Sequence, residues 1–478
     1  MKLFDKKNAQ LLERKVIGSS NTSGFTLMAK AALKILSIAK QHGTKNLWVL
    51  AGPGNNGGDA IMTASFGVLD NFEVSCTLLG QSKGDAKKAV CFAEMIGLNI
   101  TDQLPKINKL RAHSDIVVDG LLGLGAARAP EGTILKAIKF INQASKKGIF
   151  VLSIDLPSGI NPDSGELLGK IAVKANKTIM LLSPKQACYT GSSSNYVGEL
   201  VFSDLGVENY AKFGTKTSEL ITPTLLNIKK ISKTSHKGSN GSVLILGGWN
   251  NMQGAGFLAG LAAARTGVGK VFICTPNLTT RPMELIGIEP KIDDFKSCLK
   301  QVSAVVAGPG LTVEANEFLE LVWVSKIPLV LDAYGLRWLA QRNNQKKRKN
   351  NWIGTPHVGE TIQLLGEHRW EKDRFVQLTL LNKIYGGTWI LKGPGTLVGP
   401  CPTYVNNFAD GILATAGTGD VLAGITGGML SQGYSKPGAL ATYIHSESAR
   451  KIIAKKSSRL IASDLLNYIG MSLHEIES

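Results

Sequence analysis

The sequence predicts an α/β protein with two domains, and three observations carry this prediction. Short apolar runs rich in Val, Ile and Leu alternate with segments of helical periodicity, which is typical of parallel sheets flanked by helices. This alternation occurs in two stretches, separated by a polar segment near residues 203 to 235. The chain has 478 residues, and at about 150 residues per domain this length accommodates two large domains.

The first stretch begins with a helix at residues 25–41, where apolar residues recur at helical spacing from Leu27 to Ile38. We expect this amphipathic helix to pack on the sheet as scaffold. The apolar runs that follow it predict strands at residues 46–51, 74–79, 115–119, 149–155 and 177–183.

The polar segment after the first stretch carries scattered Gly, Pro and Lys, as expected of a connection between domains. We place the boundary near Phe213, which predicts domains at residues 1–213 and 214–478. The alternation then restarts, with a small-residue helix at residues 254–266 and a long apolar helix that opens at Gly417. Strands are predicted in this second domain at residues 242–248, 270–275, 303–308, 327–333 and 388–393.

The charge balance favours anionic ligands. Lys plus Arg number 54 and Asp plus Glu number 36, a formal net charge of +18, which suits nucleotides, phosphates or nucleic acids. Part of the excess lies in residues 341–351, and a charge run of this kind is typical of a solvated connection. Because no nucleic-acid-binding module surrounds this run, we expect no nucleic-acid partner.

The remaining composition excludes several classes of protein. The six cysteines form no C-x-x-C pair, which argues against a zinc site or a disulfide framework, and we expect ordinary, mostly buried thiols. No stretch approaches the ~20 consecutive apolar residues of a membrane span, and the start MKLFDKKNAQLLERK lacks the apolar core of a secretion signal. We therefore expect a cytoplasmic protein with no membrane partner.

A Gly-rich turn follows the first predicted strand. The sequence GPGNNGGDA has glycines at Gly52, Gly54 and Gly57 in the G-x-G-x-x-G spacing, with Glu73 about twenty residues later, which is typical of a dinucleotide-binding turn. A tight turn between a strand and a helix also needs glycine, so the spacing alone leaves both interpretations open. The amides and the carboxylate at residues 55–59 add oxygens suited to a hard cation or to ligand hydroxyls.

Two further predicted strands end in acidic residues. DIVVD ends in Asp119, and IFVLSID ends in Asp155 with Ser158 shortly after it. In a parallel sheet these ends face the same crevice as the Gly-rich turn, so together with Asn56 they are suited to hold a monovalent cation and a substrate. Each Asp alone is more typical of a turn or a helix cap, but their joint occurrence favours a site.

The motifs GPGNNGGD, VDGLLGLG and SIDLPSGINPDSG occur in this order and resemble those of the bifunctional NAD(P)H-hydrate repair enzyme family. They are similar to its N-terminal NAD(P)H-hydrate epimerase domain, which implies a Rossmann-like three-layer α/β/α sandwich over residues 1–213. Ala60, where glycine is usual, and GLGAARAP, where GTGLSRP is typical, depart from the family pattern.

This resemblance assigns expected roles to residues of the first domain. It implies that Asp155 is the catalytic acid/base residue and that K⁺ binds Asn56, Asp119 and Ser158. It also implies that the hydrated nucleotide binds the following residues: Asn55, Asn56, Gly57, Gly58, Asp59, Gly123, Leu124, Gly125, Ala126, Ala127, Arg128, Ala129 and Asp155.

In the second domain, the turn TAGTGD opens the long apolar helix. Backbone N–H groups at residues 417–419 would form an anion hole, and Asp420 beside them would deprotonate a hydroxyl that attacks a phosphoryl group. Asp420 is equally typical of a plain helix cap. Upstream, ILKGPGT places Lys392 and a flexible turn where a nucleotide phosphate would lie. No G-x-x-x-x-G-K-[ST] pattern occurs, which excludes a P-loop ATPase.

Six ordered motifs of the second domain resemble the ADP- or ATP-dependent NAD(P)H-hydrate dehydratase domain, a relative of the ribokinase-like kinases. They are HKGSNGSVLILGG, AGPGLT, PLVLDA, TPHVGE, LKGPGT and AGTGDVLAG. The resemblance implies a ribokinase-like α/β domain with Asp420 as its catalytic residue. DAYGL at residues 332–336 departs from the usual DADAL, and the basic loop after it is an insertion.

The same resemblance implies two groups of ligand contacts in the second domain. His357 alone is more typical of a helix entry or of a satisfied core histidine, so its role depends on the TPHVGE match. Expected around the hydrate are Ala255, Gly310, His357 and Asp420, and expected around ADP are Lys392, Gly393, Pro394, Gly395, Thr396 and Gly419.

Together the resemblances imply a nicotinamide nucleotide repair enzyme that is both an isomerase and a lyase. It would interconvert the R and S forms of NADHX and NADPHX, and dehydrate the S form to NAD(P)H at the expense of ADP or ATP, releasing AMP or ADP and phosphate. K⁺ would serve the epimerase, and Mg²⁺ with ADP or ATP the dehydratase. We expect a homo-oligomer whose partners are these small molecules. The alternative is a ribokinase-like small-metabolite kinase with a non-catalytic N-terminal nucleotide-binding module.

Overall fold

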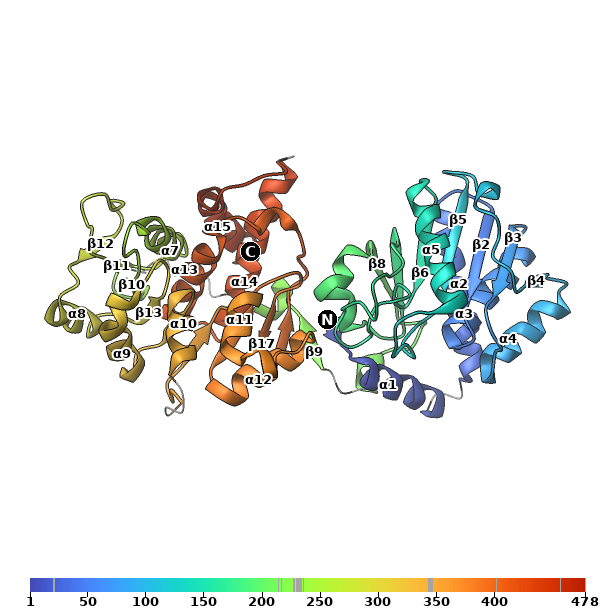
Figure 1. Cartoon of the computed structure of the whole chain (residues 1–478), viewed down its shortest axis with the longest axis horizontal. Coiled ribbons are helices and arrows are strands. Elements are labelled where there is room, and N and C mark those ends of the chain that lie inside the picture. Colours follow the sequence, from blue (N-terminus) through green and yellow to red (C-terminus); the bar gives the residue numbers. More distant parts are fainter. Residues whose placement is uncertain are drawn as a thin grey trace. The chain divides into compact units, whose positions relative to one another are not determined.

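The computed structural model describes the chain except for residues 20–21, 214, 216, 227, 229–233, 235, 343–346, 401, 456 and 478. The chain divides into two compact units, Lys2–Glu219 and Leu220–Ser478, the latter together with Met1. Figure 1 draws the first unit in blue to green and the second in green to red. The boundary that we predict near Phe213 remains a proposal.

The first unit is built on a parallel sheet with the strand order β4-β3-β2-β5-β6-β7-β8. The five predicted strands correspond to β2, β3, β5, β6 and β7, whereas the sequence analysis missed β4 and β8. The strands are β2 (Asn46–Ala51), β3 (Glu73–Leu78), β4 (Ile100–Thr101), β5 (Asp115–Gly120), β6 (Phe150–Ile154), β7 (Lys177–Leu181) and β8 (Glu199–Ser203). In addition β1 (Lys2–Leu3) pairs antiparallel with β9 (Ser218–Leu220).

Helices cover both faces of this sheet. One core joins Val49 and Ile116 of the strands to α1 (Lys6–Ser19), α2 (Gly24–Gln41), α3 (Asn55–Leu69) and α4 (Gly84–Met95). A second core joins Leu50 and Val117 to α5 (Gly132–Lys146). Since successive residues of a strand point to opposite faces, both faces of the sheet are buried. The predicted three-layer α/β/α sandwich is confirmed, and the predicted first helix is α2.

The second unit contains a longer, mixed sheet. Its parallel part has the order β12-β11-β10-β13-β14-β15-β16, and β17 and β18 extend it in antiparallel orientation. The sequence analysis missed β12, β15, β17 and β18, each of which has only 3 residues. The strands are β10 (Ser242–Leu246), β11 (Lys270–Cys274), β12 (Ile286–Ile288), β13 (Ala304–Ala307), β14 (Leu329–Leu331), β15 (Trp352–Gly354), β16 (Thr388–Leu391), β17 (Leu397–Gly399) and β18 (Thr403–Val405).

One large core joins the sheet of the second unit to α7 (Gln253–Arg265), α13 (Thr418–Ser431), α14 (Pro437–Ala454) and α15 (Ala462–Glu477), and α13 packs on α7, α14 and β13. The predicted small-residue helix is α7 and the predicted long apolar helix is α13. The helices are α6 (Pro223–Leu226), α7 (Gln253–Arg265), α8 (Ile292–Leu299), α9 (Asn316–Val324), α10 (Tyr334–Gln341), α11 (Val358–Leu365), α12 (Arg374–Tyr385), α13 (Thr418–Ser431), α14 (Pro437–Ala454) and α15 (Ala462–Glu477).

The described part of the basic loop corrects one expectation. The sequence analysis treats residues 341–351 as a solvated connection, but Arg348 is only 7% exposed. Its guanidinium donates to the Val322 carbonyl at 2.7 Å and to the carbonyls of Trp323 and Ile327. These carbonyls lie at and beyond the end of α9, where backbone acceptors have no partner within the helix. Residues 343–346 lie outside the described chain.

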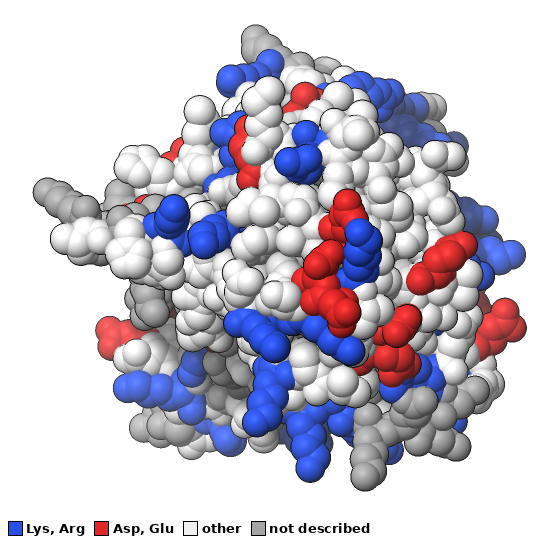
Figure 2. All heavy atoms as spheres, turned by 90° about the vertical axis from the view of Figure 1, so that its left-hand side faces the viewer, with Lys and Arg blue, Asp and Glu red and all other residues white. Residues whose placement is uncertain are grey.

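Charged side chains are dispersed on the face that Figure 2 shows. Lys and Arg side chains are spread over this face, and a group of Asp and Glu side chains lies among them. Broad areas of the face carry no charged side chain. Within the described residues, no helix is both long and apolar enough to cross a membrane. The described cysteines are free thiols, buried except for Cys91.

Candidate active sites

In the first unit, polar groups that follow three parallel strands lie close together. The carboxylate of Asp119, in β5, accepts hydrogen bonds from the Ser158 hydroxyl at 2.6 Å and from the Ser158 N–H at 2.9 Å. Ser158 Oγ accepts from the Leu122 N–H at 2.9 Å, and Asn56 Nδ2 donates to the Leu122 carbonyl at 3.0 Å. The structure thus brings together the three residues that the sequence analysis associates with K⁺.

Asp119 is completely buried in this cluster. Burial raises the pKa of its carboxyl, while hydrogen bonds from Ser158, Ser153 and the Leu121 N–H act in the opposite direction. Among the described residues, no group of three or more His, Cys, Asp or Glu side chains is arranged to hold a metal ion. The cluster instead offers carboxylate, hydroxyl, amide and carbonyl oxygens, a donor set that suits a hard cation.

A cavity of about 790 Å³ lies beside this cluster. Asn56 and Leu122 belong to its wall, and so do most residues that the sequence analysis assigns to the hydrated nucleotide, namely Asn55, Asp59, Gly123, Leu124, Gly125, Ala126, Ala127, Arg128, Ala129 and Asp155. Gly57 and Gly58 are buried in α3 instead. A Cβ at Gly57 would lie 1.8 Å from the Gly52 carbonyl oxygen, so this glycine permits the tight turn.

Asp155 lies at the cavity wall in an uncommon backbone conformation, with φ at +64°. For a residue other than glycine this left-handed region is strained, and such strain concentrates at functional sites. The Asp155 carboxylate accepts hydrogen bonds from the Leu181 N–H at 2.9 Å and from Lys185 Nζ at 2.6 Å. These contacts hold the carboxylate at the end of β7.

Lys185 is a residue of this site that the sequence analysis missed. It is 1% exposed, and Nζ also donates to the Leu181 carbonyl at 2.5 Å. A lysine is almost never fully buried unless it is paired, and here Asp155 supplies the opposite charge. The available signal was one lysine in the otherwise uncharged segment LLSPKQACY that follows a strand.

Two further carboxyl groups in the wall of the same cavity, Asp59 and Glu13, have raised pKa values. Burial raises the pKa of Asp59 well above its ordinary value, and the charges of Asp155 and Glu13 raise it further. Glu13, on α1, also has a raised pKa, caused first by burial and then by the charge of Asp155. Carboxyl groups that are raised by burial and by one another are typical of active-site clefts.

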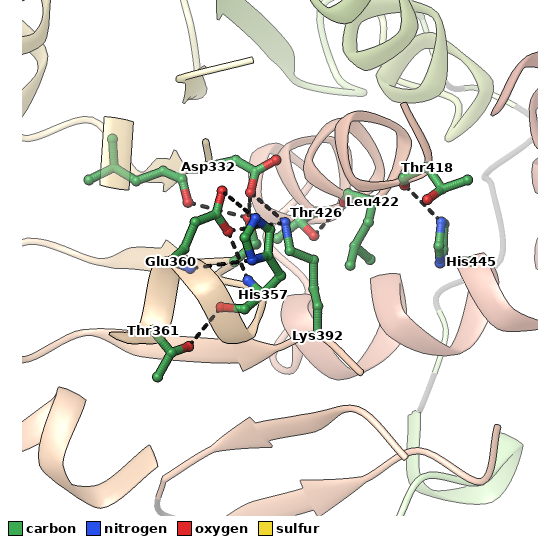
Figure 3. A network of polar contacts seen from close by, with 11 residues as sticks. Asp332, His357, Glu360, Thr361, Lys392, Thr418, Leu422, Thr426 and His445 are labelled. Atoms are coloured by element: carbon green, nitrogen blue, oxygen red, sulfur yellow. Dashed lines mark hydrogen bonds and ion pairs between the residues drawn. The ribbon is translucent and has the colours of Figure 1, made fainter. Parts of the chain in front are cut away.

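The second unit has its own polar site, shown in Figure 3, where β14, β15 and β16 end. Lys392 Nζ lies 2.8 Å from Asp332 Oδ1 and 3.7 Å from Glu360 Oε2. Thr355 Oγ1 donates to the same Asp332 oxygen at 2.7 Å. Burial alone would lower the pKa of Lys392, but the charges of Asp332 and Glu360 raise it above its ordinary value. The ammonium form of Lys392 is therefore stabilised.

His357 directly precedes α11 and is its N-cap residue. The His357 ring atom Nδ1 accepts a hydrogen bond from the Glu360 backbone N–H at 3.3 Å. The His357 backbone N–H donates to Glu360 Oε2 at 2.8 Å, which completes a reciprocal capping box. The helix-entry interpretation of this histidine is therefore correct. The cap also fixes Glu360 beside Lys392 (Figure 3). Neither Asp332 nor Glu360 stands among the predicted site residues.

Asp420 lies in the first turn of α13, close to Lys392. A Cβ at the neighbouring Gly419 would lie 3.3 Å from Lys392 Nζ. Burial and the charges of Asp332 and Glu360 raise the pKa of Asp420 to about 7, while Lys392 acts in the opposite direction. A carboxyl group with this pKa is suited to accept a proton near neutral pH.

The start of α13 requires glycine and is fixed by a buried histidine. Gly417, the N-cap residue, has φ at +89°, and a Cβ there would lie 2.7 Å from Leu258 of α7. His445 Nε2 lies 2.9 Å from the Thr418 carbonyl oxygen, and burial lowers the pKa of His445 to about 4 (Figure 3). The contact with His445 thus holds the first turn of α13 in place.

The remaining predicted residues lie in three segments, namely α7, the loop after β13 and the loop after β16. Gly310 and Ala255 face each other, since a Cβ at Gly310 would lie 3.1 Å from that of Ala255. Lys392 to Thr396 form the hairpin between antiparallel β16 and β17, where Thr396 Oγ1 donates to the Gly393 carbonyl at 3.0 Å. The individual ligand contacts of these residues remain predictions.

Comparison with known proteins places this arrangement in a family. The family model described as NAD(P)H-hydrate dehydratase matches residues 243–470, and the one described as YjeF-related protein N-terminus matches residues 24–187. The chain is 35% identical to the bifunctional NAD(P)H-hydrate repair enzyme of Coxiella burnetii, over 98% of each chain. It is 34% identical to the enzyme of that name from Escherichia coli K12, over 93% of this chain and 88% of that one.

A solved structure also resembles the second unit. It is the ADP/ATP-dependent NAD(P)H-hydrate dehydratase from Bacillus subtilis co-crystallised with ATP and Mg²⁺, 27% identical with a TM-score of 0.49, covering 55% of this chain and 100% of that one.

Two α/β units, each with a polar site where its parallel strands end, define a two-site α/β enzyme. The chain belongs to the family of bifunctional NAD(P)H-hydrate repair enzymes, because it matches such relatives along almost its entire length. The family resemblance and the bifunctional enzyme class that the sequence motifs predict are confirmed.

Proposed function

We propose that the two sites act in succession on one damaged metabolite, hydrated NADH or NADPH. The first unit interconverts the R and S hydrates, and the second converts the S hydrate to NAD(P)H with ADP or ATP as phosphoryl donor. The observation that carries the proposal is the position of Asp420, with a pKa near 7, at the start of α13 beside the ammonium group of Lys392.

Dehydration needs an activated leaving group, because hydroxide leaves poorly. Asp420 takes the proton of the hydroxyl at carbon 6, and the hydroxyl oxygen attacks the terminal phosphorus of the nucleotide. The bond from that phosphorus to the rest of the nucleotide breaks, and AMP or ADP departs. The N–H groups of residues 417–419 stabilise the transferring group. The carbon–oxygen bond then breaks, phosphate leaves, and loss of a proton from carbon 5 restores the reduced ring.

The surrounding residues hold the two reactants. Lys392, Gly393, Pro394, Gly395, Thr396 and Gly419 hold the nucleotide, while Ala255, Gly310 and His357 line the hydrate pocket. Mg²⁺ would enter with the nucleotide phosphates, whose charge it would neutralise.

Epimerisation takes place in the cavity of the first unit. Asp155 moves the proton needed to open the ring or to form an iminium ion, and Lys185 holds the Asp155 carboxylate in place. Residues 55–59 and 123–129 bind the nucleotide. Asn56, Asp119 and Ser158 would hold K⁺, which would supply a positive charge that fixes the loop.

The two proposed activities complement each other, which gives a reason for their presence in one chain. A dehydratase that acts on one epimer leaves the other behind, and an attached epimerase returns that epimer to the productive form. We further propose that the chain forms a homo-oligomer in the cytoplasm, where NAD(P)H turns over. Light scattering of the purified protein and fractionation of cells test these two points.

The deciding experiment supplies both hydrate epimers to the purified protein with K⁺, Mg²⁺ and either ADP or ATP. Reduced-nicotinamide absorbance is followed, and the remaining epimers are separated by chromatography. Consumption of both epimers, faster than they interconvert without protein, is the expected result. Loss of only one epimer would contradict an active first unit. A stable phosphorylated product would instead favour a small-metabolite kinase.

A further inference from the structure

We propose that Arg374 is a positioning residue for the nucleotide loop at residues 392–396, an inference that rests on the proposed function. Arg374 is the first residue of α12 and is only 6% exposed. It lies 18 positions before Lys392 in the sequence and belongs to none of the motifs that predict the site.

The guanidinium of Arg374 binds three backbone carbonyls around this loop. Nη1 donates to the Pro394 carbonyl at 2.6 Å and to the Gly395 carbonyl at 3.0 Å. Nη2 donates to the carbonyl of Leu391, the last residue of β16, at 2.7 Å. One rigid, planar group therefore joins the strand end to the far side of the hairpin turn.

These contacts determine which way the loop's dipoles point. A carbonyl oxygen repels a phosphate oxygen, so a loop that binds a nucleotide must turn its carbonyls away from the ligand. Arg374 provides a buried positive charge toward which the Pro394 and Gly395 carbonyls turn. A fork of several N–H donors can hold three acceptors at once, which the single ammonium of lysine cannot do with the same geometry.

The hairpin backbone is adapted to this arrangement. Gly393 has φ at +144°, which favours glycine, and a Cβ there would lie 3.3 Å from Arg374 Nη2. Other contacts fix the opposite sides of the loop, since the Lys392 N–H donates to the Pro356 carbonyl at 2.9 Å and the Gly395 N–H to the Phe408 carbonyl at 3.0 Å. The loop is therefore shaped before any ligand arrives.

The test compares Arg374→Lys and Arg374→Met with the unaltered full chain. Titration calorimetry gives the Kd of Mg²⁺–ADP, and steady-state kinetics give KM for ADP, KM for the S hydrate and kcat. The control is Arg265→Lys, an exposed arginine at the end of α7. We expect Arg374→Lys to raise the Kd and KM of ADP at least about tenfold, while kcat at saturating ADP and KM for the hydrate change less than about twofold.

Arg374→Lys keeps the positive charge, so it separates the geometry of the fork from charge and provides a folded variant if Arg374→Met does not fold. Unchanged ADP affinity in Arg374→Lys would overturn this inference and leave the proposed function standing. Equal losses of affinity for ADP and the hydrate also overturn it, because they indicate a general structural role. If the unaltered chain does not bind ADP, the proposed function and this inference both fail.

Discussion

Lys185 Nζ lies 2.6 Å from Asp155 Oδ1, although 30 positions separate these residues in the sequence. The pair joins the segment after β6 to the segment after β7, and Lys185 is almost completely buried. A buried cation beside a carboxylate at a cavity wall stabilises one orientation of that carboxylate. The fold of the first unit thus holds in place the carboxylate that we propose moves the proton in epimerisation.

Replacing Lys185 with methionine should reduce epimerisation at least about tenfold and leave dehydration of the S hydrate unchanged. The stem still fills its space, but Asp155 loses its hydrogen-bond donor and becomes a poorly compensated charge, which also lowers thermal stability. Exchange between purified epimers, followed by chromatography, measures the effect. The exposed Lys170→Met is the control. Full epimerase activity in Lys185→Met would show that the pair has no role in the reaction.

Replacing Asp420 with alanine or asparagine should reduce dehydration at least about a hundredfold, because no base remains to take the hydroxyl proton. Epimer exchange should continue at its normal rate, since Asp420 belongs to the other unit. The exposed Asp294→Asn, on α8, serves as the control. Dehydration retained by both Asp420 variants would refute the assignment of the base.

The raised pKa of Asp420, about 7, predicts how dehydration depends on pH. The ionised carboxylate is the active form, so kcat/KM should increase with pH and level off above about 7. Asp332→Asn removes a charge that raises this pKa and should move the midpoint to lower pH. A profile that is flat between pH 5 and 8 would contradict a base with this pKa.

The same shift makes a prediction about stability. Because the folded pKa of Asp420 exceeds its ordinary value, folding favours the protonated form, and ionisation destabilises the protein as pH rises through about 7. Asp420→Asn should therefore raise the melting temperature of the second unit at pH 8 by a few degrees, on the order of 1 kcal/mol. The increase should be smaller at pH 5, because the stability is lost progressively between the ordinary pKa of 3.8 and the folded pKa of about 7. Calorimetric scans at both pH values test the sign.

Epimerisation should depend on K⁺, and Ser158→Ala should raise the K⁺ concentration that gives half-maximal rate. Ser158 Oγ connects Asp119 to the Leu122 N–H, so its loss disturbs the proposed oxygen cluster. Titrating KCl at constant ionic strength with choline chloride measures this dependence. Dehydration by the same variant is the internal control. Equal epimerase rates with and without K⁺ would exclude the proposed cation role.

The sequence by itself predicted the local features. Apolar runs identified the longer strands, glycines marked turns such as Gly417, and Asp119, Asp155 and Asp420 could be located at the ends of strands or the start of a helix. These features depend on neighbouring residues, and the family motifs are also contiguous. Short strands such as β15 and β17 escaped because three residues without a longer apolar run around them are too few for periodicity to show.

Only the tertiary structure decided which charges meet. Lys392 and Asp332 are 60 positions apart in the sequence. Arg374, on α12, contacts the hairpin at residues 392–396. Such contacts arise because parallel strands end at one edge of a sheet, whatever their separation in the chain. The same reasoning explains Arg348, whose charge run suggested solvent but whose guanidinium is buried against carbonyls at and beyond the end of α9. Composition identifies a charge, but folding determines its partner and therefore its function.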